Sequence, residues 1–538
     1  MSKFLYPVDT DQFQLIREQG KLYIDKTDMV YNLVHKYQFV FLARPRRFGK
    51  SLLCNTLKAY FQGQKELFHD LMIMEMEKEW KQYPVLHFDM SQMRNCTSLE
   101  CMQEVLSAML EKYETYYGTS KHVEDHGTRL DQLLRYIYET HNQQVVIIID
   151  EYDTPLIRNL YNKETKDAIR NLLRGFYQTL KLDGAYLRFV FITGITKFSQ
   201  LSIFSELNNL KQISMFDEFS GLCGITKEEL EGVMRPCVQE YAEALGITIK
   251  EAYAVLKKNY DGYRFSRKGK LVYAPFSLLN ALSDKTCNYY WFESATSTAL
   301  IEHLKHYPEF NPLDCDGIEL CIDEFNAPCE SARTPFPLLY QSGYLTIGDY
   351  DAEINTYTLR FPNNEVRHGM VYGMTSYLMD INDTDRNATI LAMAKALVRG
   401  NLQVALTALR SWIAEIPYDI ITKKQWMAKK DSEAFYKLLM YIVFSLLNSK
   451  VQTEVKSIRG RADVVIKTKS DIFVLEIKVD KDVNDALAQI DDKGYSIPYE
   501  ADGRKVTKCG VCLSSEARNI THWKITDEHG GLVDEQMF

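Results

Sequence analysis

A basic loop that joins an apolar run to an amphipathic stretch constrains the fold of this chain more than any other feature. Residues 38–43 form a short apolar and aromatic run, which is typical of a buried strand. The loop that follows reads Arg44-Pro45-Arg46-Arg47-Phe48-Gly49-Lys50-Ser51. Beyond it, apolar side chains recur at helical spacing: Leu52, Leu53, Leu57 and Phe61. Strand, loop and helix in this order are the local architecture of a phosphate-binding P-loop.

The chemistry of the loop suits the phosphates of a nucleotide. Gly49 permits tight backbone geometry, and the Lys50 ammonium can reach the β and γ phosphates. We expect Ser51 to bind Mg²⁺. The expected nucleotide contacts are Arg46, Arg47, Phe48, Gly49, Lys50, Ser51 and Leu52. Because Arg44 stands where the general pattern has its first glycine, the loop alone leaves open a basic surface turn before an amphipathic helix.

A second feature supplies the acids that a P-loop needs. Residues 145–149 are five consecutive aliphatic residues, which is typical of a strand buried on both faces of a parallel sheet, and Asp150 and Glu151 follow directly. We expect Asp150 to hold Mg²⁺ through water and Glu151 to orient or deprotonate the attacking water. The alternative for these acids alone is a pair that caps a helix after a core strand.

Two more strands are predicted for the same sheet, at residues 84–89 and 187–194. Thr193 closes the second of them and is expected where P-loop ATPases carry a group that senses the γ-phosphate. Helical segments lie between the strands, so the pattern predicts a parallel sheet with right-handed crossovers and helices on both faces.

Further motifs follow one another along nearly the whole chain. They are Tyr23-Ile24-Asp25-Lys26-Thr27, the loop from Arg44 to Ser51, Ile149-Asp150-Glu151-Tyr152-Asp153, Thr193-Gly194-Ile195-Thr196-Lys197-Phe198-Ser199, Asn259-Tyr260-Asp261-Gly262-Tyr263-Arg264-Phe265 and Tyr273-Ala274-Pro275-Phe276-Ser277. In these motifs the chain resembles a bacterial family of AAA-ATPase-like proteins with a C-terminal nuclease-like domain. Arg44 fits that family's own form of the loop, whereas Ala274 stands where relatives often have Asn. The resemblance implies ATP and Mg²⁺ as cofactors.

The middle of the chain predicts two accessory modules. Residues 208–297 are rich in helical patterns, which suits the helical lid of an ATPase. Residues 337–347 run a helix into a strand, and 356–362 supply a hairpin partner, which is the outline of a winged helix. The connection at 348–353 is acidic, so a packing or interdomain role is at least as well supported as direct reading of DNA.

A third group of acids lies near the C-terminus. The strand at 472–478 ends in Glu476-Ile477-Lys478, and alternation places Glu476 and Lys478 on one face. Asp463 begins the neighbouring strand and can lie beside them. The two carboxylates and the Ile477 carbonyl form an oxygen-rich site that suits Mg²⁺ or Mn²⁺, and Lys478 can position or activate water against a phosphodiester.

This C-terminal arrangement resembles the PD-(D/E)XK nuclease superfamily. In that resemblance Glu433 matches the acid of the first helix, and Gln489 matches the helix residue that follows the core strands. The alternative is a nuclease fold that has lost catalysis and is retained for binding. Nearby basic residues either meet backbone phosphates or are solvated hairpin charges: Lys456, Arg459, Arg461, Lys467 and Lys481.

The whole chain predicts an α/β protein in four parts. These are a P-loop AAA-type ATPase core (1–205), a helical lid (206–310), a winged-helix-like or linker region (311–400) and a PD-(D/E)XK-like α/β domain (401–538). The 538 residues carry a net charge of −8, and we expect a cytoplasmic protein without a membrane span and with reduced cysteines. A homo-oligomer is possible, since AAA-type ATPases often complete their sites between subunits.

These patterns lead to two hypotheses of different class. The first is an ATP-binding, Mg²⁺-dependent ATPase coupled to a metal-dependent nuclease that acts on DNA. The second is an ATP-switched DNA- or protein-binding regulator whose nuclease fold only docks. The intact acids at 463 and 476 favour the first, and the acidic net charge mildly favours the second.

Overall fold

The structure is a computed structural model in which the chain divides into two compact units. The first is Met1–Ala295 with Asp316–Val366, and the second is Thr296–Cys315 with Arg367–Phe538. The structure describes residues 4–538 apart from 120–122, 124, 161, 183, 198–208, 292–302, 305, 308–309, 311–314, 330–331, 380–382, 416–438, 440–442, 445–446, 448–451 and 456–462.

A five-stranded parallel sheet is the centre of the first unit, with the strand order β2-β3-β4-β1-β5. Its strands are β1 (Phe39–Ala43), β2 (Val85–Asp89), β3 (Val145–Asp150), β4 (Leu187–Gly194) and β5 (Lys211–Gln212). Every residue of β3 is buried, as an aliphatic strand between two helical layers requires. The parallel order brings the carboxyl ends of β1, β2, β3 and β4 to one edge.

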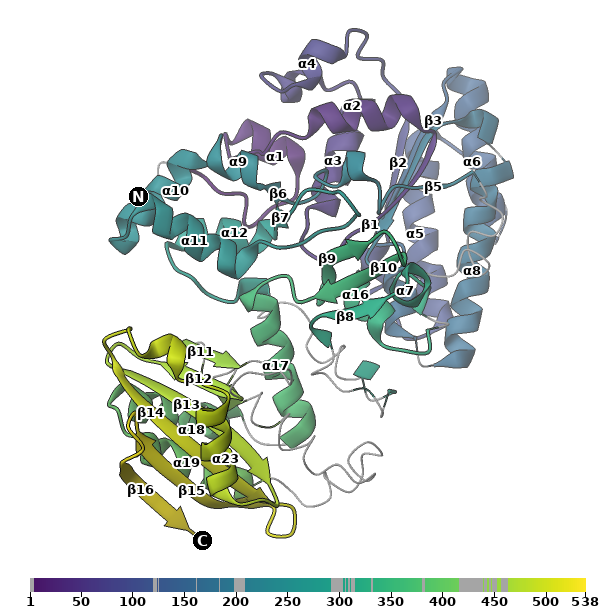
Figure 1. Ribbon diagram of the computed structural model, residues 1–538. Helices are drawn as coiled ribbons and strands as arrows, with labels where there is room; N and C mark the ends of the chain where they lie inside the picture. Colours follow the sequence, from purple (N-terminus) through teal and green to yellow (C-terminus); the bar gives the residue numbers. More distant parts are fainter. Residues whose placement is uncertain are drawn as a thin grey trace. The chain divides into compact units, whose positions relative to one another are not determined.

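Helices cover both faces of this sheet (Figure 1). The helix after the loop, α3 (Lys50–Phe61), packs against β3 on one face. The other face carries α5 (Leu99–Tyr117), α6 (His126–His141) and α8 (Lys163–Leu182), and the core there includes Leu106, Leu133, Ile147 and Phe176. The described residues of this part also form the helices α1 (Phe13–Glu18), α2 (Thr27–Lys36), α4 (Ile73–Met76) and α7 (Thr154–Arg158).

A helical module follows the sheet in the sequence. It contains α9 (Lys227–Glu231), α10 (Arg235–Leu245), α11 (Ile249–Tyr260), α12 (Pro275–Asp284) and the short strands β6 (Ile225–Thr226) and β7 (Val272–Tyr273). Thr226 and Glu229 form the capping box that starts α9, as their spacing predicts. These helices share a core of their own, which includes Leu230, Val238 and Leu256.

The predicted helix and hairpin of the winged-helix-like region are present. They are α16 (Phe336–Gln341), β9 (Thr346–Asp351) and β10 (Thr356–Arg360), accompanied by α15 (Ile322–Phe325). A third strand, β8 (Ile318–Leu320), pairs with β10 and completes the order β8-β10-β9. The sequence did not predict β8, because three residues are too few to show a strand period.

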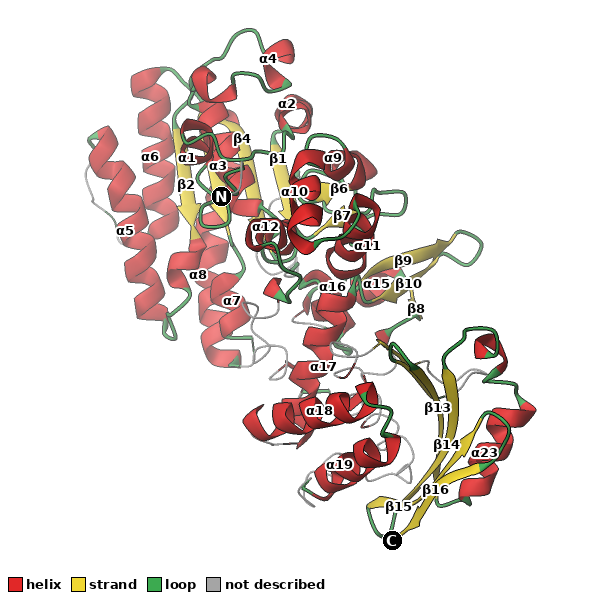
Figure 2. Ribbon diagram, turned by 90° about the vertical axis from the view of Figure 1, so that its left-hand side faces the viewer, coloured by secondary structure: helices red, strands yellow, loops and turns green. Residues whose placement is uncertain are grey.

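The second unit is built on a six-stranded sheet with the order β11-β12-β13-β14-β15-β16. Its strands are β11 (Gln452–Val455), β12 (Val464–Lys467), β13 (Asp471–Val479), β14 (Lys505–Ser514), β15 (Asn519–Asp527) and β16 (Leu532–Met537). Figure 2 shows α23 (Val483–Asp492) on one face, and α18 (Asp383–Val398) and α19 (Leu402–Ala414) on the other. The strands β12 and β13 form the predicted hairpin, whereas β13 and β14 are parallel and joined through α23.

The predicted α/β fold class is confirmed for both units. The helix α17 (Asn364–Met379) spans the boundary between them in the sequence.

The cysteines correct one expectation. Cys96 and Cys101 form a disulfide, so the prediction of reduced thiols is wrong for this pair. Ser98 starts α5 between them and brings their Cα atoms to 5.6 Å, which lies within disulfide range. Cys509 and Cys512 are buried free thiols in β14.

No helix in the part of the chain that the structure describes is both long enough and apolar enough to cross a lipid bilayer.

Candidate nucleotide and nuclease sites

The loop after β1 makes a left-handed turn into α3. Gly49 caps the helix with a φ of 86°, and Arg47 has a φ of 67°. A Cβ atom added at Gly49 would meet nothing within 4 Å, so the backbone conformation rather than space favours glycine there. Because α3 begins at Lys50, the unpaired amides of its first turn lie at the loop, as phosphate binding requires.

Lys50, Ser51 and Asp150 meet beside this loop. Lys50 is buried, and its Nζ donates a hydrogen bond of 3.0 Å to the Pro45 carbonyl. The Ser51 side chain lies close enough to the Asp150 carboxylate, at the end of β3, to favour its charged form. Burial raises the pKa of Asp150 to about 6, although Ser51 and Lys50 act in the opposite direction. The structure thus brings together three side chains predicted to serve the phosphates and Mg²⁺.

Glu151 follows Asp150 with a φ of 50°, a conformation that is uncommon for a residue with a side chain. Its Oε2 accepts hydrogen bonds from Arg94 Nη2 at 3.3 Å and from the Thr154 hydroxyl at 3.0 Å. Such backbone geometry persists where neighbouring contacts enforce it and is common at functional sites. Arg94 is therefore a candidate positioning residue for Glu151 that the sequence pattern did not indicate.

Asp89 is another acid at this edge of the sheet. It ends β2 in register with Asp150, and its charge contributes to the raised pKa of Asp150. Sequence reasoning missed Asp89 as a site residue. The signal was available in the sequence, because the predicted strand at 84–89 ends in Asp89 just as the aliphatic run at 145–149 is followed by Asp150.

Thr193 lies in β4 directly beside β1, in register with Leu42. Its buried hydroxyl donates a hydrogen bond of 2.7 Å to the Leu42 carbonyl. The residue is close to the loop as expected, and its role as a γ-phosphate sensor stays a prediction. Asp153 is fully buried and accepts hydrogen bonds from the backbone amides of Ile195 and Thr196, so it fixes the segment after β4.

Arg44 has a structural role that explains its place in the loop. Its buried guanidinium donates hydrogen bonds to the carbonyls of Ala43, Ser214 and Phe219, at 2.9, 2.8 and 3.3 Å. It also lies 4.3 Å from the centre of the Phe265 ring. Arg44 thus fastens the start of the loop to the segment after β5 and to the helical module.

The other loop side chains differ in their surroundings. The Arg47 guanidinium lies 3.8 Å from the centre of the Phe276 ring, while Arg46 is half-buried. Phe48 is fully buried and packs edge-on against Tyr263. Phe48 therefore anchors the loop by packing and also lines a cavity. Its predicted contact with nucleotide stays a prediction.

An apolar cavity of about 90 Å³ opens beside Gly49. Its lining comes from the N-terminal segment, α3 and the helical module, and includes Tyr23, Ile24, Phe48, Leu52, Ile225 and Leu279. Lys26 also lines it and pairs with Glu229 at 2.5 Å. Sequence reasoning did not assign these N-terminal residues to a site, since their only signal was the motif that begins at Tyr23.

The C-terminal acids assemble around the hairpin of β12 and β13. Asp463 Oδ2 accepts a hydrogen bond of 2.9 Å from the Ile477 amide, and the Asp463 amide donates to Glu476 Oε2 at 3.4 Å. Lys478 Nζ donates to Glu476 Oε1 at 3.0 Å and to Gln489 Oε1 at 2.6 Å. Gln489 in α23 also donates to Glu476 Oε1. Four of the predicted nuclease residues therefore lie within one hydrogen-bonded group.

The electrostatics of this group suit a cation. Glu476 is only 2% exposed, and burial followed by the charge of Asp463 raises its pKa, while Lys478 lowers it. Two neighbouring carboxylates that repel one another suit a hard divalent ion, which would relieve their repulsion. Lys481 is exposed, and Lys467 Nζ lies 4.8 Å from the centre of the Tyr499 ring. The other predicted residues lie outside the described residues: Glu433, Lys456, Arg459 and Arg461.

Comparison with known proteins matches two segments of the chain to family models. Residues 7–204 match the family model described as "Predicted AAA-ATPase", and residues 431–523 match that of the PD-(D/E)XK nuclease superfamily. The chain is also 30% identical over 533 residues to "Uncharacterized protein in vnfD 5'region" of Azotobacter chroococcum mcd 1, covering 97% of this chain and 98% of that protein. The chain belongs to the family of AAA-ATPase-like proteins that carry a C-terminal PD-(D/E)XK nuclease-superfamily domain.

Proposed function

We propose that this protein is an ATPase whose nucleotide cycle governs a metal-dependent nuclease that cleaves DNA. The observation that carries the nuclease half is the group of Asp463, Glu476, Lys478 and Gln489 around one hairpin. The ATPase half is supported by Lys50, Ser51 and Asp150 at one end of the parallel sheet.

In the ATPase half, each side chain has a distinct task. Lys50 neutralises charge on the β and γ phosphates. When it does so, its ammonium gives up the hydrogen bond to the Pro45 carbonyl. Ser51 and Asp150 hold the hydrated Mg²⁺, which neutralises charge on the phosphates. Glu151, positioned by Arg94, orients the attacking water and takes its proton. The apolar cavity beside Gly49 is the proposed site of the base.

In the nuclease half, Asp463 and Glu476 hold a divalent ion, which when bound polarises the scissile phosphate. The Ile477 amide fixes the Asp463 carboxylate by its hydrogen bond. Lys478 orients a water molecule for attack on phosphorus, and Gln489 holds the Lys478 ammonium in place. The buried setting of Glu476 favours neutralisation of its charge by a cation rather than by solvent.

The test is a cleavage assay on single- and double-stranded DNA with Mg²⁺ or Mn²⁺, with and without ATP. We expect Asp463→Ala to abolish cleavage and Lys50→Ala to abolish ATP turnover. Asp492→Ala is the matched control for the nuclease site, because Asp492 is an exposed acid at the end of α23. Cleavage that persists unchanged in Asp463→Ala would refute the assignment of the nuclease site.

The second candidate function is an ATP-switched regulator that binds DNA or protein through an inactive nuclease fold. The net charge of −8 is the observation that favours it. This function is supported if DNA is bound in an ATP-dependent manner but is not cleaved with either metal. Lys50→Ala should then abolish the effect of ATP on DNA binding.

A further inference from the structure

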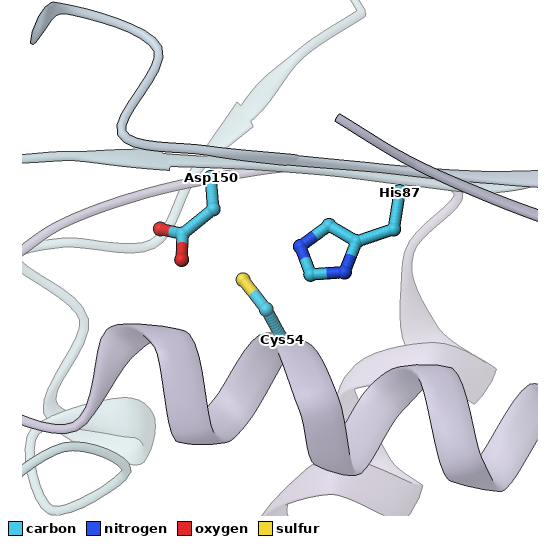
Figure 3. A group of neighbouring side chains, drawn as sticks. All are labelled: Cys54, His87 and Asp150. Carbon is cyan, nitrogen blue, oxygen red and sulfur yellow. The ribbon is translucent and has the colours of Figure 1, made fainter. Parts of the chain in front are cut away.

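Three potential metal ligands meet behind the P-loop, on the face of the sheet that α3 covers. They are the thiol of Cys54 in α3, the imidazole of His87 in β2 and the carboxylate of Asp150 in β3, and one ligand atom from each lies within 4.8 Å of the others. Figure 3 shows that the three side chains converge, with Cys54 between His87 and Asp150. Cys54 lies one helical turn beyond Lys50, so this group is next to the proposed phosphate site.

The position of His87 is an independent sign of a ligand. Its Nε2 is buried and has no hydrogen-bond partner among the described residues. A ring nitrogen faces Cys54 and Asp150 in Figure 3. The Tyr113 hydroxyl fixes the backbone of His87 through two hydrogen bonds. It accepts from the His87 amide at 2.7 Å and donates to the His87 carbonyl at 2.9 Å. A buried polar atom without a partner is costly, and a metal ion would satisfy it.

The donor set distinguishes this group from the proposed Mg²⁺ site. Sulfur and nitrogen ligands suit Zn²⁺ and similar transition ions, whereas Mg²⁺ prefers oxygen. Donors in a tetrahedral zinc site lie about 3.5 Å apart, so these ligands need to approach by only about 1 Å. Three protein ligands leave a fourth position for water.

We propose that Cys54, His87 and Asp150 bind Zn²⁺ or a similar transition-metal ion, and that this binding excludes the Mg²⁺ complex of ATP. The neutral Cys54 thiol releases one proton when its sulfur binds the metal. The exclusion of MgATP by zinc rests on the proposed ATPase function, because Zn²⁺ and the Mg²⁺ of MgATP would both need the Asp150 carboxylate. By linkage, MgATP must weaken zinc binding by the same factor by which zinc weakens MgATP binding.

The direct test uses Co²⁺ as a probe of the full-length protein after removal of bound metals by a chelator. We expect one equivalent of Co²⁺ to give a thiolate-to-cobalt charge-transfer absorption band. The band should be lost in Cys54→Ser and in His87→Gln, and kept in Cys237→Ser, a matched control because Cys237 is a buried free thiol of the helical module. Unchanged circular dichroism establishes that each variant is folded. A band that is absent from the wild type, or that survives in Cys54→Ser, overturns the proposal.

A second measurement separates the metal site from its effect on nucleotide. Binding of a fluorescent ATP analogue with Mg²⁺ is titrated with Zn²⁺, and we expect Cys54→Ser to need at least tenfold more Zn²⁺ for the same displacement. If nucleotide binds equally well at saturating Zn²⁺, the proposed exclusion is refuted. If the cobalt band forms as expected but no nucleotide binds under any condition, the metal site is supported and the ATPase function fails.

Discussion

Asp150 is a buried carboxylate whose surroundings oppose its charge, so it should reduce the stability of the nucleotide-free protein. Its pKa rises from 3.8 to about 6, mainly through burial, and the residue is 4% exposed. Above pH 6 the carboxylate is ionised in both folded and unfolded chains, and the folded state bears the full cost. Below about pH 4 it is protonated in both, and the cost disappears.

We therefore expect Asp150→Asn to stabilise the nucleotide-free protein at pH 7.5 by about 1–3 kcal/mol, an upper range set by the pKa shift. The gain should shrink as the pH falls from 6 towards 4. Thermal unfolding between pH 4.5 and 8 measures it, with the exposed Asp349→Asn as the control. A loss of stability at pH 7.5 would show that the Asp150 charge is compensated in the folded protein. Asp150→Asn should also abolish ATP turnover, so the substitution would raise stability while removing activity.

Glu476 leads to a second prediction at the scale of single residues. Since burial and Asp463 raise its pKa, Mn²⁺ binding at the nuclease site should weaken with falling pH, beginning above the ordinary range of a glutamate. Lys478→Met removes the charge that lowers this pKa, so the pH midpoint of Mn²⁺ binding should move upward. Electron paramagnetic resonance of free Mn²⁺ measures the midpoint. The exposed Lys481→Met is the control, and an equal shift in both variants would contradict the prediction.

The sequence predicted residues that act through local spacing and missed those that act through distant contacts. Alternation along β13 was enough to place Glu476 and Lys478 on one face. The role of Arg44 was not predictable, because its partners Ser214 and Phe219 are about 170 residues away along the chain. The meeting of Cys54, His87 and Asp150 likewise depends on the strand order.

At the scale of elements, the winged-helix-like region supports the P-loop directly. Gly343 follows α16 with a φ of 90°, and a Cβ atom added there would lie 2.7 Å from the Pro45 side chain. Pro45 in turn supplies the carbonyl that accepts the Lys50 hydrogen bond. Close approach of the turn to the loop therefore requires glycine, for space as well as for backbone conformation.

We expect Gly343→Ala to weaken MgATP binding several-fold and to destabilise the protein by about 1–3 kcal/mol. Gly317→Ala is a matched control, because Gly317 has a φ of 93° but open space around it. The control should cost only the backbone strain, about 1 kcal/mol, and leave the Kd for nucleotide unchanged. Isothermal titration and thermal unfolding of both variants measure the difference. Equal effects on nucleotide binding would show that Gly343 does not support the loop.

Element length decided how much of the fold was predictable. The long aliphatic run of β3 and the alternation of β13 predicted their strands, because each covers several periods of its pattern. The two-residue strands β5, β6 and β7 carry no period, and pairing with longer neighbours establishes them. The four-part division of the chain stays a prediction, beside the two units that the contacts define.

At the scale of the whole molecule, each candidate site is assembled from residues of a single unit. Lys50, Ser51 and Asp150 belong to the first unit, and Asp463 and Glu476 belong to the second. Among the described residues, the side chains expected to bind ligand at each site therefore all come from one unit. Control of the nuclease by ATP must then act on conformation or on access of DNA, and not by sharing ligands.

This separation predicts how two substitutions differ in the full-length protein. Lys50→Ala should leave the Kd of Mn²⁺ at the nuclease site unchanged within about twofold, yet cleavage of DNA should no longer respond to ATP. Asp463→Asn should leave the Kd of MgATP unchanged while abolishing cleavage. Mn²⁺ titration, nucleotide titration and cleavage with and without ATP measure the three quantities, and Asp492→Ala controls for a change of charge in the second unit. If Lys50→Ala weakens Mn²⁺ binding as strongly as it weakens nucleotide binding, binding at the two sites is energetically coupled. ATP control would then act on metal affinity itself, because a coupling free energy appears in the equilibrium binding of both ligands.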